Sequence, residues 1–201
     1  THSDNDHIRG LYSLLDLFPV RNFLTLGQNS VGKRLKSLQK KSREKGSEFI
    51  PLKLNEPITI GEVRLIPLHP GPDQPSTSSR RIDNDLSLVL RLEFKDFSML
   101  FTGDISDKIE KVLSASPLQA DILKGPHHGS RFSNSQVFIN AVHPDTVIFS
   151  SGYLNRMHHP HPQTLERYQS AGVDIRRTDL NGAVQIFTNG NEYEIHTNES
   201  L

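Results

Sequence analysis

Thr1-His2-Ser3-Asp4-Asn5-Asp6-His7 stands first in the chain and carries four potential metal ligands, two histidines and two aspartates, within six positions. Histidine and aspartate side chains are common ligands of divalent first-row metals. The same stretch could also be a polar, frayed N-terminus with no ligand role. The heptapeptide alone leaves both interpretations open, and the choice depends on the rest of the chain.

Two later segments carry the same kinds of side chain, each shortly after an apolar run. Asp104 ends the segment Met99-Leu100-Phe101-Thr102-Gly103-Asp104, and His127 and His128 follow the apolar residues 120–123. Short apolar runs predict buried strands, and loops that follow strands often carry functional side chains. Combined with the N-terminal stretch, these residues predict a metal site.

In this order, the motifs resemble the metallo-β-lactamase fold in the variant found in the C-terminal domain of the ComEC family, the membrane channel proteins of bacterial DNA uptake. The shared motifs are His-x-Asp-x-Asp-His at 2–7, Thr-Gly-Asp at 102–104 and His-His-Gly-Ser at 127–130. Further matches cover residues 84–89, 155–162 and 177–183, so the resemblance extends over nearly the whole chain. It implies an α/β fold, an αββα sandwich with mixed sheets.

Length and composition fit one globular domain, residues 1–201. Lys and Arg number 23, as do Asp and Glu, so any attraction to nucleic acid must come from a local cluster. The absence of cysteine excludes disulfides and thiolate metal ligands. No apolar run approaches the roughly 18 residues of a membrane span.

The resemblance also bears on the place of the chain in a larger protein. The family fold has several strands before its first metal loop, so we expect a fragment of a longer membrane protein that lacks the first N-terminal strands. The chain would be a soluble domain of a bacterial inner membrane protein, on the extracytoplasmic side. The membrane channel and the other domains of that protein would be its partners.

Apolar periodicity predicts both helices and strands. Helices are expected at 8–18, 106–113, 133–142 and 162–171. The third of them should be capped by Ser133 or Asn134. The strand-like runs 49–54 and 63–68, joined through 58–61, predict a hairpin or a short meander. Strands joined by helices, with antiparallel hairpins among them, predict α/β layers with mixed sheets.

Residues 33–45 are strongly basic, with seven Lys or Arg opposed only by Glu44. Leu35 and Leu38 give the stretch a thin apolar stripe, which predicts a surface helix. One interpretation is a solvated helix face without a partner. The other is contact with the phosphate backbone of single-stranded DNA, to which three lysines would contribute: Lys36, Lys40 and Lys41.

The resemblance implies two divalent metal ions that share Asp104 as a bridging ligand. The remaining ligands would be His2 and Asp4 for the first ion, and Asp6, His7 and His128 for the second. Asp4 departs from the wider superfamily, which usually has histidine at that place. An oxygen ligand makes the first position harder, so Mn²⁺ or Mg²⁺ becomes plausible there beside Zn²⁺.

Several residues near these ligands are candidates for catalysis and substrate binding. Adjacent side chains on an extended segment point in opposite directions, so His127 would face the substrate or support the ligands while His128 binds metal. His159 matches a family position near the metals and could hold a phosphate oxygen or protonate a leaving group. Ser130 could present its backbone N–H to an anion, and Arg131 could neutralise a phosphate.

The resemblance implies a metal-dependent phosphodiesterase, a nuclease that degrades the DNA strand that is not imported during natural transformation. Asp6 would orient the attacking water. One alternative is hydrolysis of a small phosphodiester or a lactone, because the fold does not fix the substrate. Another is a non-catalytic module that guides DNA in the uptake channel. The basic stretch favours nucleic acid over small substrates, and the nearly complete ligand set favours an enzyme.

Overall fold

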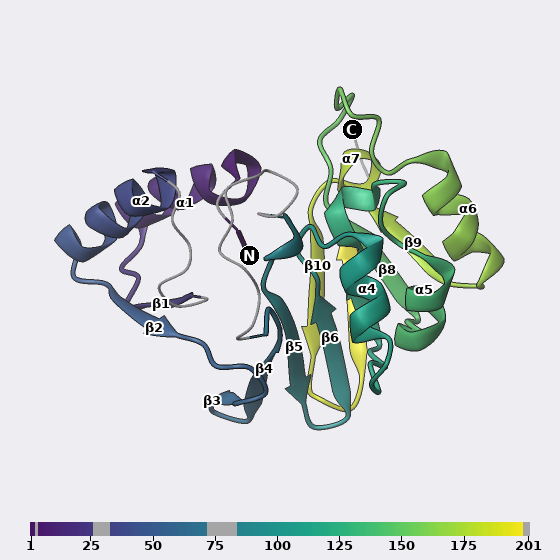
Figure 1. Ribbon diagram of the computed structural model, residues 1–201, viewed down its shortest axis with the longest axis horizontal. Helices are drawn as coiled ribbons and strands as arrows, with labels where there is room; N and C mark the ends of the chain where they lie inside the picture. The colour runs from purple at the N-terminus through teal and green to yellow at the C-terminus, as the bar shows by residue number, and fades with distance from the viewer. Residues whose placement is uncertain (3, 26–32, 72–83, 199–201) are drawn as a thin grey trace.

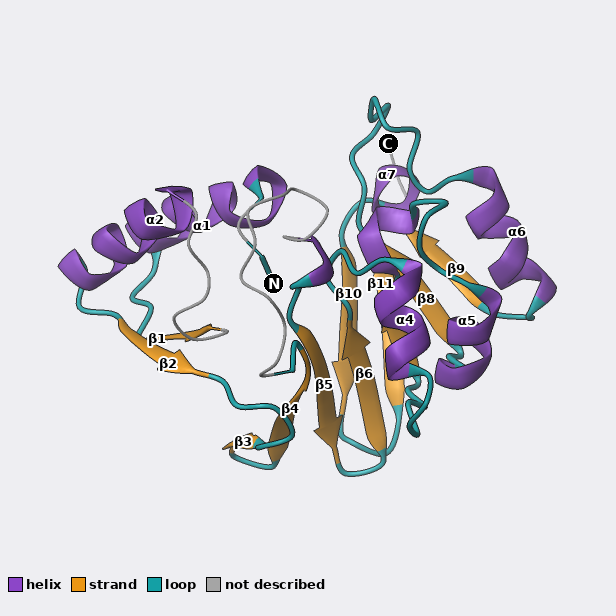
Figure 2. Cartoon of the chain, in the orientation of Figure 1, coloured by secondary structure: helices purple, strands orange, loops and turns teal. Residues whose placement is uncertain are grey.

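The computed structural model of the chain describes residues 1–2, 4–25, 33–71 and 84–198, with residues 33 and 34 described by their backbone alone. Its centre is a seven-stranded mixed sheet in the order β3-β4-β5-β6-β7-β8-β9 (Figure 1 and Figure 2). The strands are β3 Ile58–Ile60, β4 Val63–His69, β5 Val89–Phe94, β6 Phe97–Phe101, β7 Ile122–Lys124, β8 Thr146–Phe149 and β9 Asp174–Arg177. The predicted α/β fold with a mixed sheet is confirmed.

Strand direction changes in the middle of this sheet. Strands β3 to β6 run antiparallel, whereas β6 to β9 run parallel. Parallel neighbours need crossover connections, which here contain α4 Asp107–Leu113, α5 Gln136–Val142 and α6 Pro162–Ser170. Because β6, β7 and β8 are parallel, their carboxyl ends meet at one edge of the sheet. In open α/β sheets, ligands bind at this edge.

Both faces of the sheet are covered. Successive side chains of a strand point to opposite faces, and in β7 both Ile122 and Leu123 are fully buried. Leu123 belongs to the core formed with the helices, whereas Ile122 packs against the antiparallel hairpin of β10 Val184–Thr188 and β11 Tyr193–Thr197. The predicted sandwich thus consists of helices, the seven-stranded sheet and a second, two-stranded sheet.

The N-terminal part has a small core of its own. It contains α1 Asn5–Leu17, β1 Asn22–Thr25, α2 Lys33–Glu44 and β2 Glu48–Pro51. Ile8, Leu15 and Leu38 are buried between the two helices. The prediction that residues 49–54 join the meander was wrong, because β2 pairs in parallel with β1 across α2. Strands on either side of one helix pair in this way as a βαβ unit.

The described residues also form the short turn η2 Pro126–Gly129 and the single-turn helix α7 Thr178–Asn181. Two small sheets of described residues flank the large one in sequence, β1–β2 before it and β10–β11 after it. Across the described residues, no helix is long and apolar enough to cross a membrane.

Candidate metal centre

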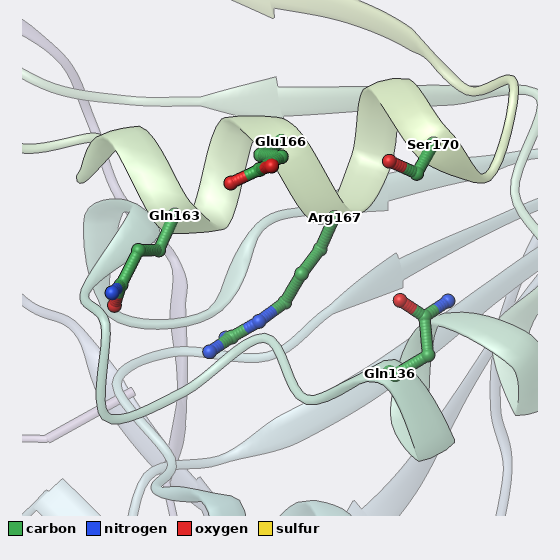
Figure 3. A pocket seen from close by; sticks show the side chains of 5 residues that line it. All are labelled: Gln136, Gln163, Glu166, Arg167 and Ser170. Carbon is green, nitrogen blue, oxygen red and sulfur yellow. The ribbon is translucent and has the colours of Figure 1, made fainter.

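One open hollow lies away from the predicted ligands. Gln136 of α5 and four residues of α6, Gln163, Glu166, Arg167 and Ser170, line it (Figure 3). Arg167 points across it and donates to the carbonyl oxygens of Ser133 and Asn134. Its lining contains two amide side chains, one carboxylate and one guanidinium, but none of the predicted metal ligands. The predicted metal ligands lie instead at the carboxyl edge of the sheet.

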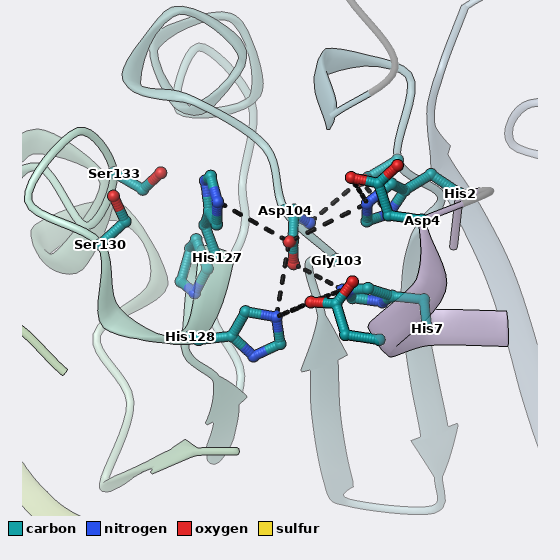
Figure 4. A network of polar contacts seen from close by, with 12 residues as sticks. His2, Asp4, His7, Gly103, Asp104, His127, His128, Ser130 and Ser133 are labelled. Carbon is teal, nitrogen blue, oxygen red and sulfur yellow. Dashed lines mark hydrogen bonds and ion pairs between the residues drawn. The ribbon is translucent and has the colours of Figure 1, made fainter. Parts of the chain in front are cut away.

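Asp104 lies at that edge, at the corner after β6. Gly103 there has a φ of +56°, and a Cβ atom on it would lie 2.6 Å from the Cβ of Ser87. The close approach lets the Ser87 hydroxyl accept a 3.0 Å hydrogen bond from the Asp104 N–H. Asp104 is only 3% exposed. A glycine at position 103 therefore allows a buried carboxylate to be held where the other side chains converge (Figure 4).

The register of the sheet brings the turn η2, which contains His127 and His128 and is called the histidine turn below, beside Asp104. Phe101 of β6 pairs with Lys124 of β7. Asp104 and His127 each follow three residues later, so the two segments leave the sheet side by side. The His127 N–H donates to the Gly103 carbonyl over 3.0 Å and ties the turn to the corner.

His127 and His128 lie in the turn η2 and both have left-handed backbone angles, with φ of 46° and 55°. The prediction that their rings point apart was wrong, because it assumed an extended backbone. Their Nε2 atoms lie 3.8 Å and 3.5 Å from Asp104 Oδ2. Both imidazoles therefore face the same carboxylate, and His127 lines the centre directly.

One hydrogen bond determines which nitrogen of His128 can bind a metal. Nδ1 donates to the carbonyl oxygen of Ser150 over 2.6 Å. A carbonyl oxygen only accepts, so the neutral ring carries its proton on Nδ1 and keeps the lone pair on Nε2. That atom faces Asp6 Oδ2 at 3.3 Å as well as Asp104. Outer hydrogen bonds of this kind orient metal-binding histidines.

The first turn of α1 supplies the next ligands. Asp4 occupies the N-cap position, and Asp6 and His7 follow in the helix. His7 Nε2 lies 3.2 Å from Asp104 Oδ1 and 3.3 Å from His128 Nε2. Ligand atoms of Asp6, His7, Asp104 and His128 all lie within 4.8 Å of one another. The structure thus brings together the ligands predicted for the second metal ion.

His2 and Asp4 complete the cluster on the other side of Asp104. His2 Nε2 lies 3.7 Å from Asp4 Oδ2 and 3.9 Å from Asp104 Oδ2. Its Nδ1 lies 3.2 Å from the Ser87 hydroxyl. Ser87, which sequence reasoning did not single out as a site residue, therefore contacts both His2 and Asp104. The other five predicted metal ligands therefore gather around Asp104, with His2 and Asp4 in one group and Asp6, His7 and His128 in the other. Figure 4 shows Asp104 between His2, Asp4, His7 and His128.

The residues present fit a cation. His2 Nε2 and Asp104 Oδ1 are buried without a hydrogen-bond partner, although buried polar atoms normally have one. The close Nε2 atoms of His7 and His128 add two ring nitrogens that face each other. A divalent ion would satisfy nitrogen lone pairs and carboxylate oxygens together.

The charges within the cluster are strongly coupled. Burial would raise the pKa of Asp104, but contacts with His128 and His7 outweigh it and hold that pKa well below its usual range. Burial lowers the pKa of His2 to about 4. For His128, burial alone would lower the pKa, but the bond and charge of Asp104 raise it. The centre is therefore built around one ionised carboxylate.

A buried polar network holds the histidine turn from behind. Asn134 Nδ2 donates to the carbonyl oxygens of Pro126 and Ser130 over 3.0 Å and 3.3 Å. The Tyr168 hydroxyl donates to Asn134 Oδ1 over 3.0 Å. Glu110, which is fully buried, accepts from the Asn134 backbone N–H. These contacts bridge distant parts of the sequence, so no local pattern could have indicated them.

Because of the same network, α5 begins later in the chain than predicted, at Gln136. Ser133 donates its hydroxyl to the Ile105 carbonyl over 2.7 Å, and the Asn134 side chain serves the turn. The prediction that one of these two residues caps the helix was wrong, because neither has a side chain free to do so. Ser135 is the N-cap, and its hydroxyl accepts from the Phe138 N–H.

Among the predicted DNA contacts on α2, the lysines differ in their surroundings. Lys36 and Lys40 are exposed. Lys41 instead donates to Asp16 over 2.6 Å and to the Tyr12 carbonyl over 3.1 Å. This lysine therefore joins α2 to α1, and its charge is already paired.

Ser130 and Arg131 also differ from each other. The Ser130 N–H donates to the His127 carbonyl over 2.9 Å, and the residue is buried. The expected anion contact of this N–H is therefore wrong, because the turn itself uses the donor. Arg131 is exposed, with its guanidinium 4.8 Å from the centre of the Phe132 ring.

His159 lies beside the centre, with its ring centroid 5.9 Å from that of His127. Asn155 positions it, since the Asn155 amide accepts from the His159 N–H and donates to its carbonyl. Burial, with His127 and His128 nearby, lowers the pKa of His159 to about 4. At neutral pH the ring is therefore uncharged, which suits hydrogen bonding better than the donation of a proton to a leaving group.

Comparison with known proteins identifies relatives that are longer than this chain and match it over part of their length. No family model matches the chain. It is 36% identical over 188 residues to ComE operon protein 3 of Bacillus subtilis, a match that covers 92% of this chain and 24% of that protein. Competence protein ComA of Neisseria gonorrhoeae is 39% identical over 116 residues, or 56% of this chain and 17% of that protein. The chain thus spans about a quarter or less of these relatives.

Solved structures show the fold. CmlA, a diiron β-hydroxylase from Streptomyces venezuelae, matches with a TM-score of 0.59 at 14% identity, over 88% of this chain and 42% of that one. The metallo-β-lactamase fold protein YhfI from Bacillus subtilis matches with a TM-score of 0.51 at 12% identity, over 88% of this chain and 72% of that one. The metallo-β-lactamase fold predicted from the motifs is confirmed.

Proposed function

The chain belongs to the ComEC family of competence proteins, as their metallo-β-lactamase-like domain, and from this premise we propose that it is a metal-dependent phosphodiesterase acting on DNA during uptake. Its specific activity would be that of a nuclease on the strand that is not imported during natural transformation. The observation that carries the proposal is the convergence of Asp6, His7 and His128 on the buried Asp104.

The chain would bind two divalent ions, with Mn²⁺ or Zn²⁺ as the leading candidates and Mg²⁺ as a third. His2 and Asp4 would hold one ion, Asp6, His7 and His128 the other, and Asp104 both. When bound, such ions neutralise charge on a scissile phosphate and lower the pKa of water.

The remaining groups of the centre would act on the substrate. Asp6 is the most exposed of its carboxylates, with a side chain 63% accessible, so it can accept a hydrogen bond from the attacking water and orient it. The neutral His159 ring would donate a hydrogen bond to a phosphate oxygen. His127, between Asp104 and His159, would add a second donor on the same side.

DNA is favoured as the substrate by charge outside the centre. The chain is neutral overall, yet α2 carries the exposed Lys36 and Lys40. This helix packs against α1, which supplies Asp6 and His7. Arg131 adds a cation next to the histidine turn. Such clusters bind phosphate backbones without reading bases. The parent protein would present this domain beside its membrane channel, on the extracytoplasmic side of the bacterial inner membrane.

The test is hydrolysis by the chain with each metal in turn, on a fluorescent single-stranded oligonucleotide and on bis-p-nitrophenyl phosphate. We expect cleavage of the oligonucleotide, with Mn²⁺ at least as effective as Zn²⁺ because Asp4 supplies an oxygen ligand. His128→Ala should abolish cleavage, and His143→Asn, which changes an exposed histidine outside the centre, should not.

Other outcomes would replace the proposal. Hydrolysis of the small phosphodiester without cleavage of DNA would make the chain a small-substrate hydrolase. Metal and DNA binding without hydrolysis of either substrate would make it a module that guides DNA. Activity with Zn²⁺ and none with Mn²⁺ would contradict the hard-ligand argument for Asp4.

A further inference from the structure

A loop next to the metal centre exposes large apolar side chains to solvent. Tyr153 and Leu154 are 76% and 82% exposed, and Met157 is exposed as well. We call residues Gly152 to His159 the 152–159 loop; it projects at the top of the molecule in Figure 1. Clustered apolar side chains on a surface commonly mark a binding site.

The 152–159 loop has a defined conformation that internal hydrogen bonds hold in place. The Asn155 side chain donates to the Gly152 and His159 carbonyls, over 3.1 Å and 2.6 Å, and accepts from the His159 N–H over 2.9 Å. Leu154 and His158 have left-handed φ angles of 50° and 53°, which non-glycine residues adopt only where their surroundings impose them. One asparagine thus closes the loop and keeps Tyr153 and Leu154 directed outward.

The loop is also fixed to the histidine turn. The His161 N–H donates to the Gly129 carbonyl over 2.9 Å. Gly129 lies so close to Pro160 that a Cβ atom would meet it at 2.4 Å. A second exposed ring, Phe132, follows the same turn, with Arg131 against its face. Two exposed aromatic rings therefore lie on segments that adjoin the same turn, which carries His127 and His128.

We propose that Tyr153 and Phe132 form a stacking platform for the bases of single-stranded nucleic acid, on which the strand is held while its backbone reaches the metal centre. The proposal rests on the proposed function, since it names the form of nucleic acid that the same centre would act on. Aromatic rings bind unpaired bases of any sequence, because every base has a π-face. Bases in a duplex already stack on each other and leave no face free.

Charge favours a nucleic acid over a lipid surface as the occupant. Arg156 in the loop and Arg131 beside Phe132 are both exposed, and they can neutralise phosphates of the strand whose bases stack nearby. The loop that carries Tyr153 also carries His159, whose ring lies 5.9 Å from that of His127, so a strand held on the loop would have its backbone near the centre.

The platform predicts a specific pattern of binding. Affinity is measured by fluorescence anisotropy with a nuclease-resistant phosphorothioate oligothymidylate, and with a strand of equal length and backbone that lacks bases. Tyr153→Leu should weaken binding of the base-bearing strand roughly tenfold, leave the strand without bases unaffected, and leave the salt dependence unchanged. Tyr153→Phe keeps the ring and should bind like the wild type. Phe187→Leu, an exposed ring on the β10–β11 hairpin, is the matched control.

Three results would overturn the platform. The first is unchanged affinity in Tyr153→Leu while the wild type binds and cleaves DNA, which would leave the proposed function intact. The second is equal weakening for both strands, which would indicate a general loss of binding. The third is loss of binding to anionic phospholipid vesicles with normal oligonucleotide binding, which would indicate a membrane contact. A wild type that neither binds nor cleaves any oligonucleotide would remove the proposed function together with the platform.

Discussion

At the scale of single residues, the metal centre depends on side chains that do not touch a metal. Asn134 satisfies two carbonyls of the histidine turn and is itself fixed by Tyr168 and Glu110. Such outer contacts hold ligands in place and are costly to remove. His127 and His128 keep their left-handed backbone angles because the turn is tied down from both sides.

Replacing Asn134 tests this support. Asn134→Ala removes the acceptor of the buried Tyr168 hydroxyl and one hydrogen bond from each of the Pro126 and Ser130 carbonyls, so we expect a loss of about 1–3 kcal/mol in the free energy of unfolding and weaker metal binding. Denaturant unfolding in chelator and calorimetric metal titration would measure both. Asn140→Ala, which removes an exposed asparagine of α5 bonded to Gln136, should change neither. Normal metal affinity in Asn134→Ala would show that the turn does not need this support.

The histidines also predict how stability depends on pH. Burial keeps the pKa of His2 and of His159 at about 4 in the folded chain, against 6.5 when unfolded, so between these values the unfolded chain binds more protons. Stability of the metal-free chain should therefore fall as the pH drops from 6.5 towards 4. His128, whose pKa is raised, opposes this, with a contribution that is present at low pH and lost as the pH rises.

His159→Gln isolates one part of this effect. The variant lacks the titrating ring, so its loss of stability between pH 6.5 and pH 4 should be smaller than in the wild type. Urea unfolding in chelator at several pH values would compare the two. Parallel pH profiles for the two proteins would show that His159 titrates normally in the folded state.

At the scale of elements, the basic helix α2 combines two roles. Lys41 and Lys45 pair with Asp16 of α1 and so hold the two helices together. Lys36 is exposed, and within the part of the chain that the structure describes Lys40 pairs only with the neighbouring Glu44, at 3.9 Å. A surface pair of this kind is weak and yields readily to a phosphate.

Removing the two exposed lysines should therefore affect DNA and not the fold. In Lys36→Ala/Lys40→Ala, the slope of log affinity against log salt should decrease by about 0.7 for each lost contact with a single strand. Lys53→Ala/Lys111→Ala removes equal charge from exposed positions outside α2 and serves as the control. Titrations at several salt concentrations would show the difference. An unchanged slope in the α2 variant would mean that this face of the helix is merely solvated.

Elements also show how far the sequence can predict this structure. The apolar runs before Asp104 and His127 identified β6 and β7, and the motifs identified the six residues that the structure brings together at the centre. The pairing of β2 with β1 was missed, because an apolar run indicates a strand but not which strand it pairs with. The orientation of His127 was missed because left-handed angles at two non-glycine residues have no sequence signature. The Glu110, Asn134 and Tyr168 network depends on contacts across 24 to 34 residues.

At the scale of the whole molecule, the centre exists because separate parts of the fold meet at one edge of the sheet. The parallel strands bring Asp104 and the histidine turn together, and α1 adds its first turn from outside the sheet. Asp104 joins these parts, with Oδ1 near His7 and Oδ2 near His2 and His128. We propose that this carboxylate would be shared by two divalent ions.

The most direct test is the metal content of Asp104→Asn, measured by native mass spectrometry with Mn²⁺ beside the wild type. The variant keeps the shape of the side chain but loses its negative charge and one good ligand oxygen. We predict two ions per chain in the wild type and fewer in the variant, with DNA cleavage reduced by at least roughly a hundredfold. The fold should persist in chelator, with a cooperative thermal transition that shows the variant is still folded. Full occupancy by both ions and near-normal cleavage in Asp104→Asn would contradict the bridging role.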